Sequence, residues 1–213
     1  MSKWTIDKQF DFCYGHRVWS QKLIGNYCES GDSSCKCRFL HGHKGHVHVF
    51  LESDTLERGM VTDFKHLGWL KNFLDDNLDH KFIIDRNDPL FNTLLGGNLD
   101  MVEKEADLPQ KVVNVEAFCY VNGDGEDVAL KLVPSYVPGT DEIVGYKLDV
   151  NKLTGTEREY YEGFFIVNFV PTSENLCKWL YEVAETKMSL IGVKVKEIAW
   201  NETPKSRAVY SGG

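Results

Sequence analysis

Alternation of apolar and polar residues predicts β-strands near both ends of the chain. Trp4 to Phe12 and Lys44 to Glu52 place apolar side chains at alternate positions, and Val193 to Trp200 is rich in β-branched and aromatic residues. Successive side chains of a strand point to opposite faces. Each segment is therefore expected to bury one face and to leave the other in water.

Apolar residues three and four positions apart predict two amphipathic helices. The first runs from Phe64 to Asn77, and Asp63 can cap its N-terminus. The second begins at Thr172 or Ser173, and Ser173 is the better N-cap because Glu174 then opens the first turn. The apolar faces consist of Phe64, Leu67, Leu70, Phe73 and Leu74 in the first helix and Leu176, Trp179, Leu180 and Val183 in the second.

These strands and helices predict the fold class. Two pairs of strands with two helices on one side form an antiparallel α+β unit with a four-stranded sheet. Such a sheet would leave unpaired edges in a monomer, so closure by other copies of the chain has a physical motive.

Composition narrows the possible functions. The chain has 213 residues, of which 42% are hydrophobic, which is enough for one good core. It lacks both the basic stripe of a nucleic-acid-binding protein and an apolar run of membrane-spanning length. The six cysteines show no small-scaffold disulfide framework, and the N-terminus shows no secretory signal, so a cytoplasmic protein is expected.

Three histidines form the first candidate for chemistry. His41 and His43 lie two positions apart on an expected strand, so their imidazoles share one face, and His16 follows another strand-like run. Neutral imidazole is the commonest metal ligand, and three protein ligands with an open fourth position are typical of catalytic zinc. His46 and His48 would lie on the opposite face, outside this site.

Further motifs give the chain a family resemblance. In order along the chain, they are Cys37-Arg38-Phe39-Leu40-His41-Gly42-His43, Gly59-Met60-Val61-Thr62-Asp63-Phe64, Leu78-Asp79-His80, Pro171-Thr172-Ser173-Glu174-Asn175 and Glu202-Thr203. Their order and spacing resemble the 6-pyruvoyl-tetrahydropterin synthase and 6-carboxytetrahydropterin synthase family. The resemblance implies the tunnelling fold, in which such α+β units close into a barrel. It also implies a homohexamer of two trimers with active sites at subunit interfaces.

The resemblance covers residues 1–92 and 168–213, which we interpret as one discontinuous synthase domain. Residues 93–167 match no part of the family pattern and are interpreted as a β-rich insertion. Strand-like runs at 112–121 and 127–133 flank a strong turn at 122–125, and others occur at 146–150 and 164–170.

The expected insertion is also acidic. Residues 96–163 contain 14 acidic and 6 basic residues, and the rest of the chain is balanced. Because both flanks carry motif residues, the insertion is expected beside the active site or at an oligomer interface.

Cysteine spacing distinguishes two branches of this family. In the carboxy branch, the reactive cysteine stands four residues before the first histidine of His-Gly-His. Cys37 occupies this position, so the chain resembles that branch. In the pyruvoyl branch, the reactive cysteine stands six residues before this histidine, and Cys35 occupies that position. The compact Cys37 motif favours the carboxy branch, and the pyruvoyl reaction through Cys35 remains the alternative.

The resemblance implies a zinc-dependent lyase that acts on 7,8-dihydroneopterin triphosphate. The products would be 6-carboxy-5,6,7,8-tetrahydropterin, acetaldehyde and triphosphate, on the route to queuosine. Zinc would be held by the three histidines, and Cys37 would be the general base. The alternative from another functional class is a relative that binds zinc or pterin but catalyses no reaction.

The remaining motif residues have expected roles in proton transfer and pterin binding. Asp79 and His80 would form a proton relay. Glu202 would accept hydrogen bonds from the amino group and ring N–H of the pterin. Thr172, Ser173 and Glu174 would line the other side of the pterin.

Overall fold

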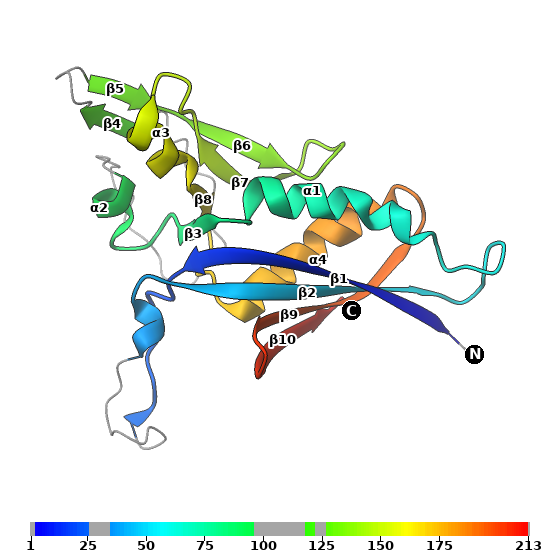
Figure 1. Ribbon diagram of the computed structural model, residues 1–213. Coiled ribbons are helices and arrows are strands. Elements are labelled where there is room, and N and C mark those ends of the chain that lie inside the picture. Colours follow the sequence, from blue (N-terminus) through cyan, green and yellow to red (C-terminus); the bar gives the residue numbers. More distant parts are fainter. Residues whose placement is uncertain (1–2, 26–34, 96–117, 122–126, 213) are drawn as a thin grey trace.

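The computed structural model describes residues 3–25, 35–95, 118–121 and 127–212 (Figure 1). The main sheet has eight strands in the order β10-β9-β2-β1-β3-β8-β7-β6, and β4 and β5 form a separate two-stranded sheet. The elements are β1 Trp4–His16, β2 His41–Ser53, α1 Gly68–Asn77, β3 Lys81–Asp85, α2 Phe91–Leu95, β4 Phe118–Val121, β5 Asp127–Leu130, β6 Leu132–Tyr136, β7 Ile143–Leu148, α3 Gly155–Glu162, β8 Phe164–Val167, α4 Ser173–Ser189, β9 Lys194–Thr203 and β10 Ser206–Ser211.

One half of the sheet is antiparallel, as the alternating segments predict. β1 and β2 pair along their whole length, from Trp4 opposite Ser53 to His16 opposite His41. β9 pairs with the other side of β2, and β10 pairs with β9. These four strands form the expected antiparallel unit.

The expectation of a sheet with only four strands is wrong. β3 pairs in parallel with the end of β1, and β8 pairs in parallel with β3. β7 and β6 then continue the sheet outward. The strands expected within 93–167 thus partly extend the main sheet, while the turn expected at 122–125 lies outside the described residues.

Two helices cover one face of the antiparallel half (Figure 1). A short 3-10 turn, Phe64–Leu67, leads into α1, and the Asp63 side chain accepts a hydrogen bond from Lys65 N at 2.8 Å. In α4 the expected cap is displaced by one residue. Thr172 has extended backbone angles and its hydroxyl accepts from Asn175 N at 3.2 Å, so Thr172 is the N-cap and Ser173 is the first helical residue.

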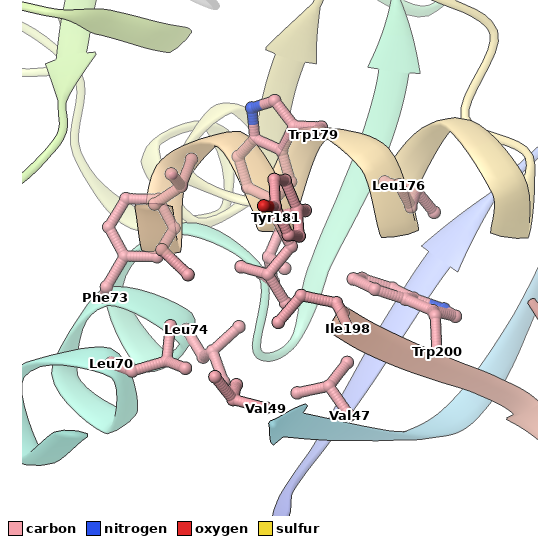
Figure 2. Packing of buried hydrophobic residues seen from close by; sticks show 14 of the residues in the cluster. Val47, Val49, Leu70, Phe73, Leu74, Leu176, Trp179, Tyr181, Ile198 and Trp200 are labelled. Atoms are coloured by element: carbon pink, nitrogen blue, oxygen red, sulfur yellow. The ribbon is translucent and has the colours of Figure 1, made fainter. Parts of the chain in front are cut away.

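The main core lies between these helices and the sheet. Figure 2 shows side chains from α1, α4, β2 and β9 meeting there. The labelled residues are Val47, Val49, Leu70, Phe73, Leu74, Leu176, Trp179, Tyr181, Ile198 and Trp200.

A second core cluster involves the other face of the parallel strands. On β3, Ile83 belongs to the main cluster, whereas its neighbour Ile84 packs with Phe91 of α2 and Tyr161 of α3. All four residues of β8 are buried, which is typical of a strand covered on both faces. No helix in the described ranges has the length and apolar character needed to cross a membrane.

The Leu74→Ala substitution tests the main core. Leu74 is fully buried, so its truncation should lower the free energy of unfolding by about 2–5 kcal/mol. Urea unfolding followed by circular dichroism measures this change. Ile191→Ala is the control, because Ile191 is 53% exposed and its truncation should cost no more than about 0.5 kcal/mol.

Candidate metal and substrate site

Three imidazoles meet where β1 ends and β2 begins. His16 is the last residue of β1 and lies directly opposite His41, the first residue of β2. His43 follows two positions later on the same face, so the ring centroids of the three residues lie 4.5–5.1 Å apart. The structure therefore brings together the histidines that the strand pattern predicts.

Backbone carbonyls orient two of these rings. His16 Nδ1 lies 2.6 Å from the carbonyl oxygen of Pro171, and His41 Nδ1 lies 2.8 Å from that of Phe39. A carbonyl can only accept, so each Nδ1 carries the proton and each Nε2 keeps its lone pair. The Nε2 atoms of His16, His41 and His43 are buried without a hydrogen-bond partner of good geometry in the described structure. For His16 and His41, this is the tautomer and orientation that a metal ligand requires.

Glu202 of β9 joins the cluster. Its Oε1 atom lies 3.3 Å from His16 Nε2 and 3.4 Å from His43 Nε2. One ligand atom from each of the four residues falls within 4.8 Å of all the others. Ligands about 2.0–2.1 Å from a tetrahedral zinc ion are about 3.3 Å apart by geometry, so the two short distances match such a site.

Charges within the cluster support metal binding. Contact with His16 lowers the pKa of the Glu202 carboxyl, against the opposing effect of burial. A hydrogen bond with Ser173 also favours the carboxylate form. Burial lowers the pKa of His43, while the negative charge of Glu202 acts in the opposite direction. A carboxylate beside neutral imidazoles is a suitable donor set for a divalent cation.

Both candidate cysteines lie in one turn close to this cluster. Cys37 belongs to the 3-10 turn Lys36–Arg38, and its side chain is hydrogen-bonded with that of Cys35. Burial raises the pKa of Cys37 to about 11, with further contributions from Cys35 and from the charge of Glu202. A cation held by the histidines would act in the opposite direction. The geometry does not distinguish Cys37 from Cys35 as the reactive residue.

Asp79 and His80 pair with each other as predicted, but outside the imidazole cluster. Asp79 Oδ1 accepts from Cys13 N at 2.8 Å, and Asp79 Oδ2 lies 3.0 Å from His80 Nδ1. The His80 side chain is 80% exposed. His80 and His43 line the same shallow hollow of about 500 Å³, together with Gly163, which directly precedes β8.

The segment before α4 reaches the site through its backbone and one hydroxyl. Pro171 supplies the carbonyl that orients His16, Thr172 caps the helix, and Ser173 contacts Glu202. Glu174 is exposed in the first helical turn. Thr172 and Ser173 are therefore beside the cluster, whereas Glu174 faces solvent in this chain.

His46 and His48 lie on the opposite face of the sheet, as predicted. His46 Nδ1 is 2.7 Å from Asp11 Oδ1, and His48 Nδ1 is 3.3 Å from Asp7 Oδ2. Each is a cross-strand pair between β2 and β1. They take no part in the metal-binding cluster.

Two contributions to the site were missed from the sequence. The orienting carbonyls of Phe39 and Pro171 have no side-chain signature. The closeness of Glu202 to the imidazoles could have been found from strand parity, because Glu202 is two residues from Trp200, which pairs with Val47 of β2.

Comparisons with known proteins identify the family. The family model described as 6-pyruvoyl tetrahydropterin synthase matches residues 5–213. A 6-carboxy-5,6,7,8-tetrahydropterin synthase from Aquifex aeolicus is 30% identical over 216 residues, covering 98% of each chain. This match extends through residues 93–167, for which the sequence motifs indicated no relative.

Solved structures show the same fold. An uncharacterized protein from Wolinella succinogenes is 41% identical, with a TM-score of 0.77 and full coverage of both chains. The 6-pyruvoyl tetrahydropterin synthase of Caenorhabditis elegans is 19% identical, with a TM-score of 0.51 over 100% of this chain and 98% of that one. Together with the match along almost the whole chain, these findings show that the chain belongs to the 6-pyruvoyl tetrahydropterin synthase family.

Proposed function

We propose that this protein is a zinc-dependent 6-carboxy-5,6,7,8-tetrahydropterin synthase. Its substrate is 7,8-dihydroneopterin triphosphate, and its products are 6-carboxytetrahydropterin, acetaldehyde and triphosphate. The proposal rests on the three buried Nε2 atoms that converge around Glu202, whose charge in turn reaches Cys37. The Aquifex aeolicus relative, whose name gives this activity, supports the choice of reaction.

His16, His41 and His43 would hold the zinc ion. Bound there, zinc supplies Lewis-acid chemistry: it lowers the pKa of substrate hydroxyls and stabilises negative charge on the neighbouring carbon. The donor set fits zinc, because imidazole and carboxylate are among its usual ligands. The carbonyls that hold two Nδ1–H groups keep the rings in place.

Cys37 would act as the general base. Its thiolate takes a proton from the substrate side chain beside the zinc ligands, and the resulting thiol can return a proton later in the reaction. The spacing of Cys37 before His41 supports this role. If Cys35 is the base instead, the enzyme would be the pyruvoyl synthase. If the protein catalyses neither reaction, it would be a relative that only binds pterin or zinc.

Asp79 and His80 would form the second proton relay. Asp79 receives a hydrogen bond from the Cys13 main chain and holds the His80 ring. The high exposure of His80 in the single chain suits a site that is completed at a contact between subunits. We propose a homohexamer of two trimers, in which the antiparallel strands close into the barrel of the tunnelling fold.

Pterin binding would involve Glu202, Thr172, Ser173 and Glu174. Glu202 was expected to face the ring donors of the pterin, yet its Oε1 atom lies among the imidazoles. The exposed carboxylate of Glu174 is the second candidate for the amino group and ring N–H of the pterin, because a carboxylate accepts both. Direct comparison of the two residues decides which one anchors the ring.

The product would enter 7-deazaguanine and queuosine biosynthesis, and the reaction would take place in the cytoplasm. Cys13, Cys35, Cys37 and Cys177 are free thiols, which suits a reducing compartment. Incubating the purified protein with 7,8-dihydroneopterin triphosphate tests the activity. Acetaldehyde and the 6-carboxy product are expected, whereas the 6-pyruvoyl product without acetaldehyde would contradict the proposal.

The His41→Ala substitution tests the metal site. The substitution should lower zinc affinity by about 100-fold or more, because the ion then keeps only two of its three imidazole ligands. Competition with a chromophoric zinc chelator measures this change. His46→Ala is the matched control on the opposite face of β2 and should retain wild-type affinity. Full zinc retention by His41→Ala would remove this residue from the site.

The Cys37→Ala substitution tests the base. Without its thiol the enzyme should lose about 100-fold or more in kcat, while binding of a pterin product remains. Cys35→Ala is the matched control in the same turn and should stay active. Should Cys35→Ala prove to be the inactive variant, the pyruvoyl reaction would replace the carboxy reaction.

The Glu202→Gln and Glu174→Gln substitutions test pterin binding. Glutamine replaces one acceptor with a donor, so loss of the anchor should weaken binding of a fluorescent pterin about 10- to 100-fold. Zinc affinity measured on the same samples identifies a carboxylate that is also a metal ligand. We expect Glu202→Gln to weaken pterin binding, and a wild-type pterin affinity for this variant would assign the anchor elsewhere.

A further inference from the structure

A buried ion pair connects the segment after His16 to the loop after β3. Arg17 Nε lies 3.1 Å from Asp88 Oδ2, with the Arg17 side chain 9% exposed and that of Asp88 1% exposed. The other carboxylate oxygen of Asp88 accepts from Leu90 N at 2.8 Å. Asp88 is therefore fixed by its own loop while it faces Arg17.

A second side-chain contact connects the same two segments. Trp19 Nε1 donates to Asp85 Oδ2 at 2.8 Å, and Asp85 is buried at the end of β3. Asp85 Oδ1 accepts from Asn87 N at 2.9 Å. Two buried carboxylates, each fixed locally, thus hold the segment that directly follows the metal-binding strand β1.

The segment held in this way also carries the cysteine turn. Val18 N donates to Cys37 O at 2.8 Å, and Arg38 Nη1 donates to Gln21 O at 3.0 Å. A continuous set of contacts therefore leads from the loop at 85–88, through residues 17–21, to Cys37.

These hydrogen bonds matter because the turn is only partly buried, so packing holds it weakly. None of the three residues of the turn Lys36–Arg38 is buried. The segment that the turn contacts is anchored by a nearly water-free ion pair, and removing one partner of such a pair is strongly destabilising. The contacts therefore connect the backbone of Cys37 to the loop that follows β3.

We propose that Asp85 and Asp88 are positioning residues for Cys37, acting through Trp19, Arg17 and the backbone of Val18. The proposal rests on the role of Cys37 in the proposed function. The proposal also gives Arg17 a structural role, since its guanidinium pairs with a buried carboxylate.

The experiment compares Trp19→Phe and Asp88→Asn with the wild-type protein as purified. Trp19→Phe keeps an aromatic ring and removes only the indole donor, so it remains informative if Asp88→Asn fails to fold. The first measurement is the alkylation rate of Cys37 by iodoacetamide, located by fragmentation mass spectrometry. We expect an increase of about fivefold or more, because a released turn exposes its thiol more often.

The second measurement separates kcat from KM with the pterin triphosphate. A misplaced base should lower kcat about tenfold or more, while KM stays within about twofold and zinc content stays unchanged. Alkylation requires no turnover. If the wild-type protein lacks synthase activity, the proposed function fails, but the alkylation rates still decide whether these carboxylates position Cys37.

Glu52→Gln is the matched control. Glu52 is a carboxylate 9% exposed that pairs with Lys3 at 3.3 Å and Lys194 at 2.8 Å, at the opposite end of β2 from His41. This variant should lose stability without changing Cys37 alkylation or kcat. Wild-type alkylation rates in Trp19→Phe, or the same increase in Glu52→Gln, would overturn the proposal.

Discussion

The site depends on the register of the antiparallel pair β1 and β2. Thirteen residues of each strand pair without interruption, and this register sets His16 opposite His41. A slip of one residue would turn every side chain of a strand to the other face and move its histidines to the side of the Asp11–His46 pair. Buried apolar residues on the metal-site face prevent such a slip, so the contacts that fold the sheet also align the ligands.

The imidazole cluster costs stability in the free chain. Three buried Nε2 atoms have no hydrogen-bond partner of good geometry, and an unsatisfied buried polar atom costs about 1–3 kcal/mol. The fold tolerates this cost because the large core beside it, built from α1, α4 and five strands of the main sheet, holds the strands rigidly. A bound cation would satisfy all three nitrogens at once, so metal binding and folding stability are coupled at this site.

The sequence predicted the strands and helices whose own residues show a regular pattern of apolar and polar positions. Alternation located β1 and β2, and the same parity separated His41 and His43 from His46 and His48. The buried run Lys81–Asp85 does not alternate, so β3 and the parallel extension of the sheet were missed. Side-chain chemistry favoured Ser173 as the cap of α4, but the extended backbone of Thr172 makes that residue the cap. The spacing of the motif favoured Cys37 over Cys35, and the structure places both thiols in one turn.

The site joins parts of the chain that are far apart in sequence. His16 is oriented by a carbonyl 155 residues later, and Glu202 arrives on β9, the second-last strand of the chain. During synthesis on the ribosome, β1 and β2 can pair early because they are close in sequence. Their imidazoles then remain uncovered until almost the whole chain has emerged. A nascent chain therefore displays a partial, solvent-open set of candidate metal ligands for most of its translation, and the finished pocket is among the last features to assemble.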